Sequence, residues 1–261
     1  MVDNQLAVIS VFSMIADCLT CLHLWVEAPE QMLGAHQILG SVHALKNLLQ
    51  VRIEILQKIS FNECADMLGS LGDSIPGLKK LNTLCVTHQK TLVLEGGAAV
   101  PDDALAITQQ AFDGFNKFNK AVTGLQGLEN LHLICMVHPQ CVNSFAVALG
   151  RLPCLRSLTM PHMDLTCVHL KRLLQPVVHM QWLSRLVLLG GIPEESNVVG
   201  SHRRSVSLIA HALRASCSSL RHFQMYYDVV GAHSGCCAGE DDPLRFTQKP
   251  VEYGYCRRAW M

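Results

Sequence analysis

The fold of this chain is decided by three short stretches: LENLHL at residues 128–133, LRSLTM at 155–160 and LSRLVL at 183–188. Each places apolar side chains at its first, fourth and sixth positions. The last three residues alternate apolar, other, apolar, which is the pattern of a strand with one buried face. A pattern that recurs along a chain indicates a repeat architecture, in which every copy builds the same structural unit.

Seven copies of this LxxLxL pattern, with conservative replacements, follow one another. Their first positions are 29, 33, 47, 27, 28 and 37 residues apart, and the longer intervals are read as the same unit with inserted loops. The copies are Leu19-Leu22-Leu24, Leu48-Val51-Ile53, Leu81-Leu84-Val86, Leu128-Leu131-Leu133, Leu155-Leu158-Met160, Leu183-Leu186-Leu188 and Leu220-Phe223-Met225.

Between the copies the apolar period changes to that of a helix. Helical spacing is clear over residues 105–122, 142–149 and 165–178. A strand followed by a helix can bury its apolar faces only against neighbouring units. The predicted fold is therefore α/β, a solenoid of about seven parallel strands backed by helices, over residues 1–230. Residues 231–261 contain Gly, Cys and charged residues without a period, and we expect an irregular tail or cap there.

Over Leu19 to Asp228 the chain resembles the ribonuclease-inhibitor-like leucine-rich-repeat superfamily, in particular the degenerate repeats found in F-box-type proteins. No F-box segment is visible before the repeats. The resemblance implies a horseshoe whose concave sheet face binds another protein. It further implies a role as the substrate-recognition part of a ubiquitin-ligase-like complex.

On the concave face, the residues that alternate with the buried leucines form three rows across the strands. The first row contains Asn130, Arg185 and His222, the second Arg52, His132 and Gln224, and the third Trp25 and Tyr226. We predict that these eight residues bind a partner protein, because a mixture of polar, basic and aromatic side chains suits a protein surface better than a small-molecule cavity. Trp25 and Tyr226 are the expected anchors.

Charge suggests the chemistry of that partner. The whole chain carries 21 basic and 21 acidic residues, which does not favour nucleic acid as a ligand. Residues 151–222, however, carry 9 basic and 3 acidic side chains. We therefore expect an acidic segment of a protein partner to bind the late repeats.

Membrane insertion and export are not expected. The apolar run from Leu6 to Ala16 has no preceding Lys or Arg and is too short to span a bilayer. The twelve cysteines are scattered and are expected to be reduced. The predicted location is the cytoplasm or the nucleus.

The alternative function is a metal-dependent protein or an enzyme that uses Cys and His. The candidate groups are Cys18-Cys21-His23, Cys135-His138-Cys141 and His233-Cys236-Cys237-Cys256, but their spacing fits no common zinc motif. No nucleophile elbow, metalloprotease helix or phosphate loop is present. We expect no catalysis, no cofactor and no small-molecule substrate.

Overall fold

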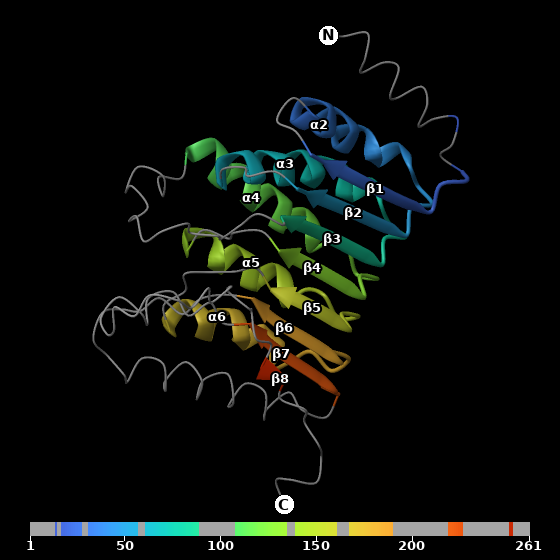
Figure 1. Cartoon of the computed structure of the whole chain (residues 1–261). Coiled ribbons are helices and arrows are strands. Elements are labelled where there is room, and N and C mark those ends of the chain that lie inside the picture. Colours follow the sequence, from blue (N-terminus) through green and yellow to red (C-terminus); the bar gives the residue numbers. More distant parts are fainter. Residues whose placement is uncertain are drawn as a thin grey trace, which may run out of the picture.

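The computed structural model of the chain describes residue 14 and residues 17–27, 31–56, 61–88, 108–134, 139–160, 167–189, 219–226 and 251–252. It is an α/β structure in which seven parallel strands form one sheet backed by helices (Figure 1). This confirms the predicted class and number of parallel strands. No helix in the described ranges is long and apolar enough to cross a membrane.

The strands lie side by side in the order in which they occur along the chain. Every copy of the sequence pattern forms one strand, and an eighth, two-residue strand pairs antiparallel with the seventh. Most of the predicted tail lies outside the described residues. The strands are β1 (Cys21–Val26), β2 (Gln50–Ile55), β3 (Thr83–His88), β4 (Asn130–Ile134), β5 (Ser157–Met160), β6 (Arg185–Leu189), β7 (His222–Tyr226) and β8 (Val251–Glu252).

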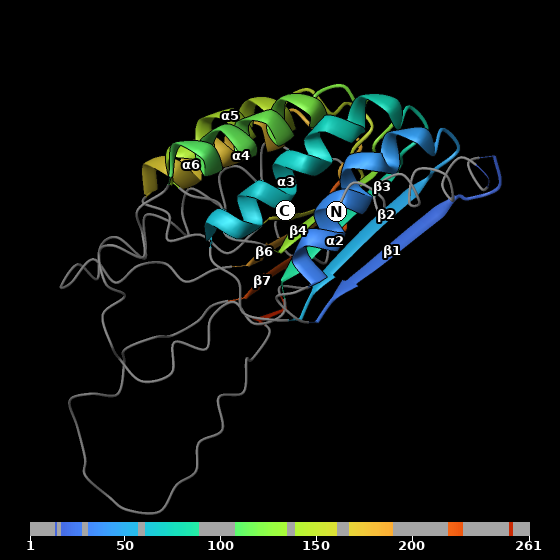
Figure 2. The ribbon, with the colours of Figure 1, turned by 90° about the horizontal axis from the view of Figure 1, so that it is seen from above.

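The helices in the described ranges lie on one face of this sheet, as the view from above shows (Figure 2). They are α2 (Gln31–Ser41), α3 (Phe61–Ser74), α4 (Gln109–Val122), α5 (Val142–Leu149) and α6 (Cys167–Val177), with short 3₁₀ turns η1 (Val42–Ala44), η2 (Ile75–Gly77) and η4 (Pro139–Cys141). Thr108 directly precedes α4, and its hydroxyl accepts a hydrogen bond from the Ala111 amide at 3.1 Å and so caps the helix. We call the opposite side of the sheet the helix-free face.

The connection from helix to strand repeats from unit to unit. Two residues before a strand begins, a leucine amide bonds to the carbonyl of the residue three places earlier, which is itself apolar and buried. This tight turn satisfies the backbone while both side chains point into the core. The five bonded pairs are Leu48 with Leu45, Leu81 with Leu78, Leu128 with Leu125, Leu155 with Leu152 and Leu183 with Met180.

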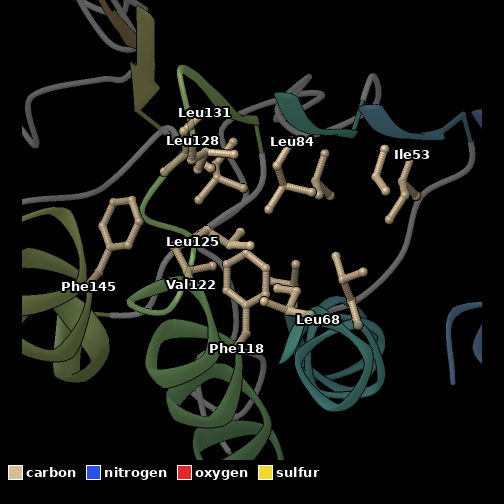
Figure 3. Packing of buried hydrophobic residues seen from close by; sticks show 14 of the residues in the cluster. Ile53, Leu68, Leu84, Phe118, Val122, Leu125, Leu128, Leu131 and Phe145 are labelled. Atoms are coloured by element: carbon tan, nitrogen blue, oxygen red, sulfur yellow. The ribbon is translucent and has the colours of Figure 1, made fainter. Parts of the chain in front are cut away.

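The core lies between the sheet and the helices. Figure 3 shows Ile53, Leu84 and Leu131 of the strands facing Leu68 and Phe118 of the helices. The pattern residues of β2 to β6 are all buried, as predicted. Those of β1 are only partly buried because β1 is the outermost strand and no described unit covers it.

The predicted helices near 142–149 and 165–178 are confirmed in position, and the predicted helix over 105–122 is described from Gln109. One apolar residue within the predicted helix 165–178 does not join the buried face. Val168 is 57% exposed. At 100° per residue it lies on the side of α6 opposite to the buried stripe of Leu173, Leu174 and Val177.

Candidate functional site

The three predicted rows are confirmed by the pairing register of the sheet. Asn130 pairs with Ser157, which pairs with Arg185, which pairs with His222; Arg52 and His132 share the second row through Cys85. Gln224 and Tyr226 occupy β7 at the expected places beside Val187 and Leu189, but their side chains lie outside the described residues. Trp25 heads the third row on β1. Strand geometry thus brings all eight predicted positions onto one face.

Exposure differs along the helix-free face. Trp25 is 62% exposed, and Arg52, Arg185 and His222 are also exposed, whereas Asn130 and His132 are half-buried. The middle of the face departs from the expected solvent-facing surface, because Ser157, Thr159 and Val187 are buried. Ser157 lies between Asn130 and Arg185, and Thr159 lies between His132 and Val187. The exposed side chains therefore form two groups, one near β1–β2 and one near β6–β7.

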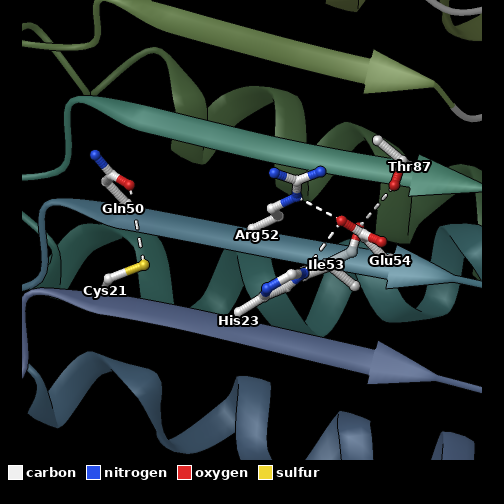
Figure 4. A network of polar contacts seen from close by, with 7 residues as sticks. All are labelled: Cys21, His23, Gln50, Arg52, Ile53, Glu54 and Thr87. Atoms are coloured by element: carbon white, nitrogen blue, oxygen red, sulfur yellow. Dashed lines mark hydrogen bonds and ion pairs between the residues drawn. The ribbon is translucent and has the colours of Figure 1, made fainter.

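The group near β1–β2 is an ordered polar network, drawn in Figure 4. The Glu54 carboxylate accepts from Arg52 Nε at 2.5 Å, and its Oε1 lies 3.2 Å from His23 Nε2. The His23 ring meets the Trp25 indole edge-on with centroids 4.8 Å apart. Nearby, the Cys21 thiol donates to Gln50 Oε1 at 3.9 Å. The exposed indole of Trp25 is thus packed against His23, which is itself held by Glu54.

The ionisation of Glu54 follows from this network. Burial acts to raise the pKa of its carboxyl, since its side chain is only 11% exposed, but the charge and hydrogen bond of Arg52 and the contact with His23 act in the other direction. The net result is a lowered pKa. Glu54 is therefore ionised at neutral pH and neutralises Arg52. It was not predicted as a site residue, although its place two residues after Arg52 on one strand puts both on the same face.

The centre of the face is organised by side-chain hydrogen bonds between strands. His132 Nδ1 lies 2.8 Å from Thr159 Oγ1, and Asn130 Nδ2 donates to Thr83 Oγ1 at 3.1 Å. Burial lowers the pKa of His132, and the charges of Arg185 and Arg52 lower it further, so this imidazole is neutral at pH 7. Its binding contribution would come from hydrogen bonding and packing and not from charge.

Ser157 Oγ is a polar atom in this centre whose hydrogen-bonding capacity is unused. It is buried and has no hydrogen-bond partner among the described residues. An unsatisfied buried hydroxyl costs on the order of 1–3 kcal/mol. A group that reached this atom from the helix-free face would recover part of that free energy.

The described residues give no support to the metal alternative. Within them, no three His, Cys, Asp or Glu side chains are placed to hold a metal ion. Cys18 and Cys21 are free and exposed, and Cys141 is buried with its pKa raised by burial to about 11. Cys135, His138, and the group His233, Cys236, Cys237 and Cys256 lie outside the described residues.

One serine–histidine contact lies on the helix side, in a cavity between α2, α3 and α4. His36 Nδ1 is 3.0 Å from Ser70 Oγ, and burial lowers the pKa of His36 while the charge of Asp66 opposes this. The geometry is not that of a catalytic triad. The Asp66 carboxylate accepts a hydrogen bond from Gln110 instead of orienting His36, and the Ser70 hydroxyl donates to the Asp66 carbonyl. We read it as a structural contact between helices.

Comparison with known proteins adds no relative: no family model matches the sequence, and no curated protein matches it either. The functional interpretation therefore depends on the geometry of the sheet and on the residues it displays.

Proposed function

We propose that this chain is a leucine-rich-repeat solenoid of the ribonuclease-inhibitor-like kind that binds a partner protein on its helix-free face, without catalysis. The observation that carries the proposal is a sheet face without a described helix, on which Trp25, Arg52, His132 and Arg185 lie on β1, β2, β4 and β6. The tight turn and the buried apolar residues that repeat before each of the strands β2 to β6 support the repeat assignment.

The dimensions of the face suit a protein partner. Six interstrand steps of about 4.8 Å make the distance from β1 to β7 about 29 Å. A typical protein interface covers about 800 Å² on each side, so a partner bound here would span several strands and not one pocket. Trp25 at one end is the strongest anchor, because large aromatic side chains contribute much of the binding energy at interfaces.

The first test is affinity capture from cell extract with the full chain and two matched variants. One variant alters the face (Trp25→Ala with Arg185→Ala), and the other alters exposed residues of α6 (Lys171→Ala with Arg172→Ala). We expect the captured partner to be lost with the first variant and kept with the second. Identical captured sets from the wild type and the face variant would contradict the proposal.

We further propose, from the resemblance to F-box-type repeats, that the bound partner is a substrate presented to a ubiquitin-ligase-like assembly. In cells, the face variant should then lengthen the lifetime of the captured partner, while the α6 variant should not. An unchanged lifetime of the captured partner would contradict the ubiquitin-ligase role and would leave the proposal of binding standing.

A further inference from the structure

A second surface lies at the edge of the sheet where β5, β6 and β7 begin. Arg156 directly precedes β5, Arg185 is the first residue of β6, and Arg221 directly precedes β7. Their backbones are joined by the ladder between units: the amides of Ser184 and Arg185 bond to the Arg156 carbonyl at 2.8 and 3.0 Å, and the Arg221 amide bonds to the Ser184 carbonyl at 2.8 Å. The starts of consecutive strands lie about 4.8 Å apart. Arg156 and Arg221 occupy equivalent positions two strands apart, and Arg185 lies one residue further along on the strand between them.

An exposed aromatic side chain lies in the same edge. Trp182 is 62% exposed, yet it stands in a turn between the buried side chains of Met180 and Leu183. Asn47, Lys80, Gly127 and Cys154 occupy the equivalent place, three residues before β2, β3, β4 and β5. Since small or polar residues serve in the other turns, the turn itself does not require an indole.

The backbone beneath these side chains is held in place. The Ser184 hydroxyl donates to the Arg156 carbonyl at 3.1 Å, and the Ser219 hydroxyl donates to the Leu183 carbonyl at 2.9 Å. Both bonds tie one unit to the preceding one at the point where the strand begins. Binding a partner would therefore cost this edge of the sheet little backbone conformational entropy.

Charge at this edge is largely unneutralised. The described residues from 139 to 226 include six Arg or Lys and no Asp or Glu. Arg156 has one acidic neighbour, Glu129, at 3.7 Å, with both side chains about half exposed. Within the described chain no acid lies in ion-pair distance of Arg185 or Arg221, whereas Arg52 at the other end of the face is paired with Glu54.

We propose that Arg156, Trp182, Arg185 and Arg221 form a docking site for an extended acidic segment of the partner, in which carboxylates flank one large apolar side chain. Arginines bind carboxylates through paired, charge-assisted hydrogen bonds, and the indole packs against the apolar side chain. We call these four residues the strand-start site. This inference rests on the proposed function, because it names where and by what chemistry the partner's acidic segment binds.

The test measures direct binding of two labelled synthetic peptides to the full chain by fluorescence polarisation. One peptide carries six glutamates around a central leucine, and in the other every glutamate is glutamine. We expect the glutamate peptide to bind, more weakly as salt is raised, and the glutamine peptide not to bind. The variants Trp182→Ala and Arg185→Gln with Arg221→Gln should each weaken binding about tenfold or more. The control Lys171→Gln with Arg172→Gln removes the same charge from α6 and should change binding by less than about twofold.

Three outcomes would overturn the strand-start site: no binding of the glutamate peptide, equal binding by the double arginine variant, or loss of binding only in the α6 control. Failure of this inference is distinguishable from failure of the proposed function. If capture of the natural partner is lost with Trp25→Ala but unchanged with Trp182→Ala and the double arginine variant, the helix-free face binds and the strand-start site does not. If Trp182→Ala also abolishes capture, the result supports both the helix-free face and the strand-start site as binding surfaces.

Discussion

Substitution by alanine is predicted to have opposite effects on stability at two helical glycines, Gly114 in α4 and Gly34 in α2. α3 and α4 pack through Gly69 and Gly114, where neither helix has a side chain. A Cβ added at Gly114 would lie 2.7 Å from the carbonyl oxygen of Ala65, and one added at Gly69 would lie 2.9 Å from the α carbon of Gly114. Both contacts are with backbone atoms, which cannot rotate away.

The magnitude for Gly114→Ala is a difference between two effects. Forcing an extra methyl group into a packed contact typically costs about 1–3 kcal/mol, and a clash with backbone belongs to the upper part of that range. Replacing Gly by Ala within a helix returns about 1 kcal/mol through helix propensity. We therefore expect a net loss of about 1–2 kcal/mol, or a melting temperature lower by roughly 2–8 °C in a chain of this size.

Gly34→Ala in α2 is the matched control. It makes the same chemical change inside a helix, but no atom lies within 4 Å of the added Cβ. We expect up to about 1 kcal/mol of stabilisation there. Thermal and urea unfolding followed by circular dichroism at pH 7 measures both variants. A Gly114→Ala protein as stable as the wild type, or more stable, would refute the close approach of α3 and α4.

Three further predictions concern the core, the polar network and the thiols. Leu131→Ala removes a fully buried side chain and should cost about 2–5 kcal/mol in the free energy of unfolding, measured with urea; a loss below about 1 kcal/mol would contradict the buried position. Because the pKa of Glu54 is lower in the folded chain than its ordinary 4.5, its ionised form stabilises the fold above that pH, and this contribution is lost as pH falls through the folded pKa. The melting temperature of Glu54→Gln should thus fall less on acidification than that of the wild type. An equal fall would contradict a contribution of ionised Glu54 to stability. Cys141, buried and with its pKa raised to about 11, should resist iodoacetamide in the native protein while exposed Cys154 reacts, as mass spectrometry would show; equal labelling without urea would contradict the burial.

Strands and face rows could be predicted from the sequence because both depend on local periodicity. The alternation around Leu131 and Leu158 fixes which side chains are buried, and stacking in chain order then fixes the register. A further local signal was available. A buried leucine stands three residues before the second, third and fourth copies, at Leu45, Leu78 and Leu125. Each adds one apolar position to the pattern and marks the turn that precedes the strand.

Other features depend on contacts between residues far apart in sequence, so no local pattern reveals them. The pairing of His23 with Glu54 joins β1 to β2 across 31 residues. The contact of Gly69 with Gly114 is visible only once α3 and α4 are packed. The exposure of Trp182 was not predicted either, because the LxxLxL pattern assigns no role to the residue that precedes a repeated leucine.

The order of the sheet turns a feature of the sequence into a feature of the surface. Since each strand lies beside its neighbours in sequence, the excess of basic residues in the late repeats is gathered at one end of the sheet. At β1–β2 the Arg52 charge is compensated within the fold by Glu54, so a partner binding there must compete with an existing ion pair. At β6–β7 Arg185 and Arg221 have no such partner among the described residues. An arginine near β7 therefore contributes more to the binding of a carboxylate than Arg52 does near β1–β2. This difference favours the acidic part of a partner near β7 and its apolar part near Trp25.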